Sequence, residues 1–310
     1  MVNGVRSGMT LSPVLQAWLA GLSLYGWIWI IPILERLFPM RGQKLLRPGI
    51  LNDLAHTYHP LQLWIFLYSA FAAWVAAYAQ QHGGSTLPLQ GALANAHWAW
   101  NLLALFLIGH TTFYGAHFLS HKIPMLWQFH RVHHSSQTLD SFSTSRFHIF
   151  DKTLFAFPGL MLIAYFQPDP GLTFLYVSFS DFWGRYGHGN IRDAHWLGYF
   201  LSNPKFHRWH HSNHPEAIDK NFSAEFNFLD YLFGTAYYPK EGVPDNFGES
   251  GYSNNIVVQH YRPFHDCYKI VKKDGWMALL RKPKSKTKPK SNAKPDPDTH
   301  QSDTLNAVHE

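Results

Sequence analysis

The histidines of this chain carry its most informative pattern, because 21 of its 310 residues are histidine and several recur at fixed spacing. His117 and His121 are separated by three residues, and an H-x-x-H-H pattern follows at 130–134. The same pattern recurs at 207–211, which reads HRWHH. Side chains three or four positions apart lie on one face of a helix, so each cluster presents imidazoles together.

These clusters predict a metal centre. Imidazole binds iron, zinc, copper and nickel, so the spacing alone leaves the metal open. The clusters hold more imidazoles than the usual four ligands of a tetrahedral zinc site. In each triplet the outer pair shares a face and the middle histidine is turned by about 100°, so one triplet can serve two adjacent ions. The residues concerned are His117, His121, His130, His133, His134, His207, His210 and His211.

Long apolar segments predict that the first histidine cluster lies where a transmembrane helix leaves the membrane. Residues 14–34, 60–79 and 95–115 are each long enough to cross a bilayer core of about 30 Å. The loop at 36–47 is basic, whereas the loop at 80–91 contains no lysine or arginine. By the positive-inside rule, the third segment returns to the cytoplasm and delivers His117 to that face.

A further apolar stretch at 154–183 is interrupted by QPDPG at 167–171. Each half has about a dozen residues, which is short for a full span. We therefore predict a helical hairpin that dips into or barely crosses the bilayer, with both ends on one side. That return brings the later histidines back to the earlier ones. A buried hairpin in a soluble protein is the alternative.

The predicted fold class is all-α: an integral membrane helical bundle of about three spans plus a short hairpin, with a histidine-rich cytoplasmic cap. The domains expected are N-terminal transmembrane helices over 1–94, a histidine-bearing domain over 95–280 and a disordered basic tail over 283–310. The net charge of +6 is concentrated near that tail, so nucleic acid is not an expected partner. A single cysteine excludes an intrachain disulfide and suits a reducing compartment.

The order of these motifs, on helices expected in a membrane, resembles the fatty acid hydroxylase/sterol desaturase superfamily of integral-membrane di-iron oxidases. The similarity extends over roughly 100–238 and includes shorter motifs around the clusters. These are Pro124 with Leu126 and Trp127, Arg146-x-His148, His188-Gly189-Asn190, Asp219-x-Asn221-Phe222, and Asp230-x-x-Phe233-Gly234-Thr235.

The resemblance implies two iron ions per chain, held by nine histidines, because it adds His188 to the eight above. It implies that O2 is used to hydroxylate or desaturate an unactivated C–H position of a sterol, fatty acyl or related lipid, with 95–280 as the catalytic domain. It also implies that His148 and Asp230 orient ligating imidazoles through their second nitrogen. The implied ligands are His117, His121, His130, His133, His134, His188, His207, His210 and His211.

A separate electron donor of the cytochrome, ferredoxin or reductase type is expected. The sequence contains no G-x-G-x-x-G fingerprint for a flavin or dinucleotide and no cysteine set for an iron–sulfur cluster. The expected localisation is multi-pass in a membrane, with the site and the C-terminus facing the cytoplasm.

The chain departs from the family pattern at a few positions. His110 stands where an aspartate is common, seven residues before the first cluster. Two helical turns place it on the ligand face, as an orienting group or an added ligand. Phe118 stands where arginine is frequent, and Ser223 replaces the glycine of a common NYG motif.

Two other classes of function fit a histidine-rich membrane protein. A zinc-dependent hydrolase or a metal transporter can use the same clusters, although transporters place ionisable residues in mid-span. A non-catalytic scaffold would be expected to have lost some of the clustered histidines.

Overall fold

The computed structural model describes residues 27–57, 74, 78, 81, 89–249 and 251–281. In these parts the regular structure is helical, and β-type pairing is limited to isolated bridges such as Pro39 with Ile191. The predicted all-α class is therefore confirmed. Most of the first two predicted spans, at 14–34 and 60–79, and the predicted tail at 283–310 lie outside the described residues.

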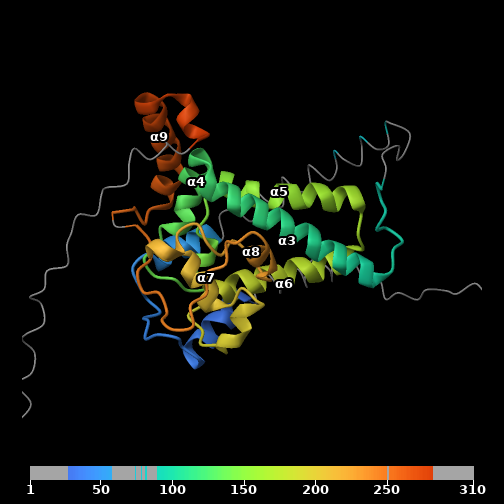
Figure 1. Ribbon diagram of the computed structural model, residues 1–310, viewed down its shortest axis with the longest axis horizontal. Helices are drawn as coiled ribbons and strands as arrows, with labels where there is room; N and C mark the ends of the chain where they lie inside the picture. The colour runs from blue at the N-terminus through green and yellow to red at the C-terminus, as the bar shows by residue number, and fades with distance from the viewer. Residues whose placement is uncertain are drawn as a thin grey trace, which may run out of the picture.

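Three long helices form the elongated half of the molecule (Figure 1): α3 (Trp98–Lys122), α5 (Ile149–Phe166) and α6 (Pro170–His188). The central helix, α3, packs against both of the others. Both α3 and α5 are long and apolar enough to cross a membrane. At about 1.5 Å per residue, α3 is about 37 Å long, so the predicted span at 95–115 continues into the histidine cluster.

The hairpin helices are longer than predicted, with 18 residues in α5 and 19 in α6. The prediction of two short halves was wrong, because each helix continues beyond its apolar run into polar turns. The ring of His148 caps the start of α5 by accepting from the Phe150 amide, and α6 runs on to His188. The reversal between them uses Gln167 in a left-handed conformation and Asp169 as N-cap of α6.

The remaining helices gather at one end of this bundle (Figure 1). Only Ile123 separates α3 from α4 (Pro124–His134), so the helices that carry the first two histidine clusters follow each other directly. α9 (Ile256–Asp274) packs against α4. The other elements are η1 (Ser143–Ser145), η2 (His195–Tyr199), α7 (Pro204–His210), η3 (Pro215–Ala217), α8 (Phe228–Leu232) and η4 (Trp276–Leu279).

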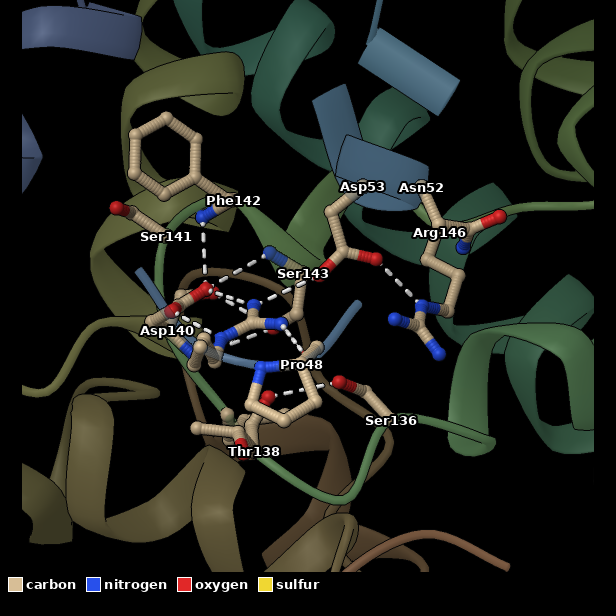
Figure 2. A network of polar contacts seen from close by, with 12 residues as sticks. Pro48, Asn52, Asp53, Ser136, Thr138, Asp140, Ser141, Phe142, Ser143 and Arg146 are labelled. Carbon is tan, nitrogen blue, oxygen red and sulfur yellow. Dashed lines mark hydrogen bonds and ion pairs between the residues drawn. The ribbon is translucent and has the colours of Figure 1, made fainter. Parts of the chain in front are cut away.

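Buried ion pairs fasten helical residues 50–57 to this end of the molecule (Figure 2). Asp53 is fully buried and accepts from Arg146 Nε at 2.6 Å and from Arg47 Nη2 at 2.7 Å. Arg47 also donates to Asp140 at 2.6 and 2.7 Å. A buried carboxylate is tolerated only when such partners satisfy it, so this network fixes the loop that leads into α5.

Candidate metal centre

The nine implied ligands lie together as two adjacent groups. In each group the side chains place one nitrogen each within 4.8 Å of the others. The first group combines α3, α4 and α7: His117, His121, His130, His134 and His210. The second combines α4, the end of α6 and α7 with its C-cap: His133, His188, His207 and His211.

The two H-x-x-H-H triplets are divided between the groups in a reciprocal way. His130 and His134 enter the first group, while His133 between them enters the second. The later triplet does the opposite, because its outer pair enters the second group and His210 enters the first. The split within each triplet follows from helix periodicity, since the middle residue points to a different face from the outer pair.

Hydrogen bonds at Nδ1 fix the orientation of most of these rings. His117 Nδ1 donates to the Phe222 carbonyl at 2.7 Å, and His210 Nδ1 to the Lys220 carbonyl at 2.7 Å. His188 Nδ1 donates to its own helix at the Gly184 carbonyl, 2.8 Å away. An imidazole that donates through Nδ1 presents a lone pair at Nε2, and this is the form that binds a metal.

Carboxylates and a further carbonyl orient other members. His130 Nδ1 donates to Asp151 Oδ2 at 3.0 Å, and His133 Nδ1 donates to the Arg146 carbonyl at 3.2 Å. Asp219 Oδ1 lies 3.4 Å from His121 Nδ1.

The Nε2 atoms face one another at short range. His210 Nε2 lies 2.8 Å from that of His117 and 3.0 Å from that of His134. In the second group, His188 Nε2 lies 3.1 Å from both His133 and His207. Lone pairs held this close repel unless a cation lies between them. Two nitrogens bound at about 2.1 Å and at a right angle would be about 3.0 Å apart, so the donor set fits metal coordination.

Orphaned nitrogens point to the same conclusion. His121 Nε2 and His130 Nε2 are buried and have no hydrogen-bond partner among the described residues. Buried polar atoms are normally satisfied, so each such atom requires an explanation. A metal ion bound by the first group would supply the missing partner for both.

Burial favours the neutral form of several of these imidazoles. It lowers the pKa of His210 to about 3. Burial, followed by the neighbouring imidazoles, lowers the pKa values of His133 and His211 well below the ordinary value for histidine. The neutral ring is the one that coordinates a metal, so the site is ready to bind at physiological pH.

Aromatic side chains surround the two groups. Phe147 stacks on His133 with ring centroids 4.1 Å apart, and Phe155 stacks on His130 at 5.4 Å. Phe222 is fully buried and meets His117 edge-on. These rings limit the access of water to the imidazoles and hold their planes in place.

In the described part of the chain, none of the three residues proposed to orient imidazoles hydrogen-bonds a ring of the two groups directly. His148 hydrogen-bonds elsewhere among the described residues, since its Nδ1 caps α5 and its Nε2 contacts the His260 carbonyl at 3.1 Å. Asp230 acts one step away: it accepts from the backbone amides of Phe222 and Ser223 at 2.8 Å. The carbonyl of Phe222 in turn accepts from His117.

His110 lies outside both groups, so its prediction as an added ligand is not met by the geometry. Its Nδ1 lies 3.1 Å from Glu225 Oε2, and its ring stacks on Phe228. Seven residues keep His110 on the face of His117 but displace it by about 10 Å along the helix. It therefore belongs to a separate buried polar pair with Glu225.

Asp151 and Glu225 are buried acids that sequence reasoning did not single out. The available signal for Asp151 was an acid in the first turn of a largely apolar helix. Asp219 and Asn221 were noted only as motif residues, and the structure gives them positive φ values of 58° and 60°. Asn and Asp tolerate that conformation better than other side chains, which accounts for their use in this tight loop.

Two cavities reach the histidines from different sides. One of about 370 Å³ lies among α3, α5 and α6 and touches His117, His130, His133, His188 and His207. The other, of about 490 Å³, is lined by more polar residues, among them Gln128, Arg131 and Glu249, and touches His121, His134, His210 and His211. The first cavity extends from both groups between α6 and the two apolar helices α3 and α5.

Comparison with known proteins agrees with this geometry. The family model described as fatty acid hydroxylase matches residues 102–235. The ornithine lipid hydroxylase OlsE of Rhizobium tropici is 30% identical over 244 residues, which cover 76% of this chain and 72% of that protein. The chain belongs to the fatty acid hydroxylase family, as the motifs predicted.

More distant relatives match shorter segments. The human alkylglycerol monooxygenase is 28% identical over 157 residues, covering 49% of this chain and 34% of that protein. The cholesterol 25-hydroxylase of Rattus norvegicus is 25% identical over 138 residues, covering 44% and 46%. No solved structure matches the chain significantly. Family membership makes this protein an oxidoreductase of lipid metabolism associated with membranes, and it argues against the hydrolase and transporter alternatives.

Proposed function

We propose that this protein is a membrane-bound di-iron oxygenase that hydroxylates a C–H bond of a lipid. The observation that carries the proposal is the meeting of two adjacent histidine groups with an apolar cavity between membrane-type helices. The family and the names of its relatives, which are lipid hydroxylases and monooxygenases, support it.

The two histidine groups would each hold one iron ion, with all nine histidines as ligands. Imidazole suits iron, and such a pair of ions supplies the redox chemistry that activates O2. In the balanced reaction, a C–H bond, O2, two electrons and two protons give an alcohol and water. Because the sequence has no flavin or dinucleotide fingerprint and no cysteine set for an iron–sulfur cluster, the electrons would come from a separate cytochrome, ferredoxin or reductase.

The residues of this chain have three tasks in that reaction. Asp151 and the carbonyls of Phe222, Arg146 and Lys220 hold the imidazoles in their metal-binding orientation. The aromatic rings of Phe147 and Phe155 exclude water from one side of the site. The cavity among α3, α5 and α6 admits the lipid from the bilayer. The catalytic domain is proposed to span 95–280, with the site on the cytoplasmic side.

The decisive experiment combines metal analysis with lipid analysis. Purified protein should contain about two irons per chain, the number for which the two groups provide. Lipid extracts from cells with and without the gene, grown under labelled O2, should differ by a product that retains the label. His133→Ala and His210→Ala should each abolish that product. Stoichiometric zinc with no O2 consumption in the presence of a reductant would contradict the proposal, and a loss of two hydrogens would indicate desaturation.

A further inference from the structure

The ionisable side chains that line the apolar cavity gather at its histidine end, whereas the other end is lined by aliphatic and aromatic side chains with the hydroxyl groups of Thr112 and Tyr176. Along α5 its wall is formed by Lys152, Ala156, Gly159, Leu160 and Ile163, which lie on one face of the helix. Lys152 is in the first turn, beside the histidine groups, and Ile163 is about 16 Å farther along the axis. The cavity therefore has a charged end next to the candidate metal site and an apolar end remote from it.

Lys152 reaches the immediate surroundings of the second histidine group. Its Nζ lies 4.9 Å from the centre of the Phe147 ring, and that ring stacks on His133 at 4.1 Å. One aromatic layer thus separates the ammonium group from an imidazole of the site. In the described parts of the chain, no hydrogen bond or ion pair satisfies Lys152 Nζ.

The two carboxylates whose charges act on Lys152 form hydrogen bonds to other residues. Asp181, on the facing wall of α6, forms an ion pair with Arg185 at 3.1 Å. Asp151, the other carboxylate that acts on Lys152, accepts from His130. A partly buried ammonium group that lacks a counter-ion of its own is costly, so its place in a cavity indicates a ligand that supplies the negative charge.

A second unsatisfied group lies at the same end. Thr144 Oγ1 is buried with no hydrogen-bond partner in the described residues, and Thr144 lines this cavity together with Lys152 and Asp181. The hydroxyl oxygen has almost no accessible surface and does not face the open cavity, so the ammonium group of Lys152 is the cation that the cavity offers to an oxyanion.

We propose that Lys152 binds an anionic headgroup of the lipid substrate, either a carboxylate or a phosphate. This inference rests on the proposed function and adds the substrate class and the region of attack. With the headgroup at Lys152 and the hydrocarbon chain directed toward Ile163, the C–H bonds next to the histidine groups are those in or near the headgroup. Carbons deep in the chain lie at the far end of the cavity.

Binding to the full-length protein in detergent provides the first test. Three probes with the same twelve-carbon chain are compared: N-lauroylglycine, dodecyl phosphate and neutral monolauroylglycerol. Wild type should bind an anionic probe about tenfold more tightly than the neutral one, as expected for a charge-assisted contact. A preference for N-lauroylglycine would indicate a carboxylate headgroup, and a preference for dodecyl phosphate a phospholipid.

Variants of Lys152 test whether this side chain is the source of the preference for anionic probes. Lys152→Met should reduce it to within about twofold, whereas Lys152→Arg should retain most of it, because arginine keeps the charge. Lys269→Met, on the exposed surface of α9, is the matched control and should behave as wild type. Equal affinity of the wild type for all three probes, or an unchanged preference in Lys152→Met, would overturn the proposal. The wild-type probe series remains decisive if Lys152→Met fails to fold.

Iron content and O2 consumption of the same preparations separate the two proposals. If the protein binds iron and consumes O2 but shows no headgroup preference, the proposed role of Lys152 is refuted and the proposed function is not. Protein that binds no iron would refute the proposed function, while the probe series on the metal-free protein still reports on Lys152. Mass spectrometry of the hydroxylated lipid gives a further outcome: oxygen in the headgroup or on its nearest carbons is expected, and oxygen in mid-chain would contradict the inference.

Discussion

Asp151 Oδ2 accepts a hydrogen bond from His130 Nδ1, 3.0 Å away, and both side chains are almost completely buried. This contact joins the first turn of α5 to the ligand face of α4. A carboxylate in this position fixes the ring and raises its basicity as a metal ligand. It also explains how a charged residue is accommodated at the start of an apolar helix.

Asp151→Ala should therefore weaken metal binding by about 10- to 100-fold, the usual effect of removing such a partner. Asp151→Asn keeps a hydrogen-bond acceptor but loses the charge, so its effect should be smaller. Metal affinity is measured by competition with a chelator. Asp245→Ala, which removes an exposed carboxylate, is the control. Wild-type affinity in Asp151→Ala would show that the contact does not support the metal.

The two histidine groups should respond differently to loss of one member. His133→Ala leaves three histidines in its group, whereas His210→Ala leaves four in the other. Although both changes should abolish activity, His133→Ala should lose more iron, because fewer ligands remain for that ion. Iron per chain is measured by elemental analysis. Equal and complete loss in both variants would indicate that the two groups bind metal as one cooperative unit.

The buried network around Asp53 predicts a link between stability and the second histidine group. Asp53→Ala leaves Arg146 buried without a carboxylate partner among the described residues. Breaking a buried ion pair in this way lowers the free energy of unfolding by about 3–5 kcal/mol. The apparent melting temperature should fall clearly. Because the Arg146 carbonyl orients His133, iron retention should fall too.

The double variant Asp53→Ala/Arg146→Met supplies the control for that prediction. It removes both charges, so its destabilisation should be less than the two single effects added together. Strict additivity would show that the two side chains do not interact in the folded protein.

Orientation in the membrane is tested with a reporter fused after Leu280. The basic loop at 36–47 and the uncharged loop at 80–91 favour a cytoplasmic position for the histidine groups and for the C-terminal end of the described chain. A reporter active only in the cytoplasm should therefore give signal. Signal from a reporter active only outside the cytoplasm would overturn the orientation, without affecting the arrangement of the histidines.

The spacing of residues within single helices determined which side chains share a face in this protein. The i, i+3 and i, i+4 spacing of the clusters is a property of one helix, so the faces presented by His117, His121 and the two triplets followed from the sequence. The all-helical class and the span at 95–115, most of which lies in α3, also followed from the sequence. The role of His188 required the family resemblance, because a single histidine carries no spacing.

Only the tertiary structure decided how these faces meet. The reciprocal division of the triplets between two groups depends on how α4 and α7 are packed, and no local pattern contains that information. Contacts between separate segments likewise decided that Asp151, and not His148, hydrogen-bonds a histidine of the two groups, and that His110 pairs with Glu225. Such pairs join residues up to 115 positions apart, so their geometry is set by the packing of whole helices and not by the residues around them.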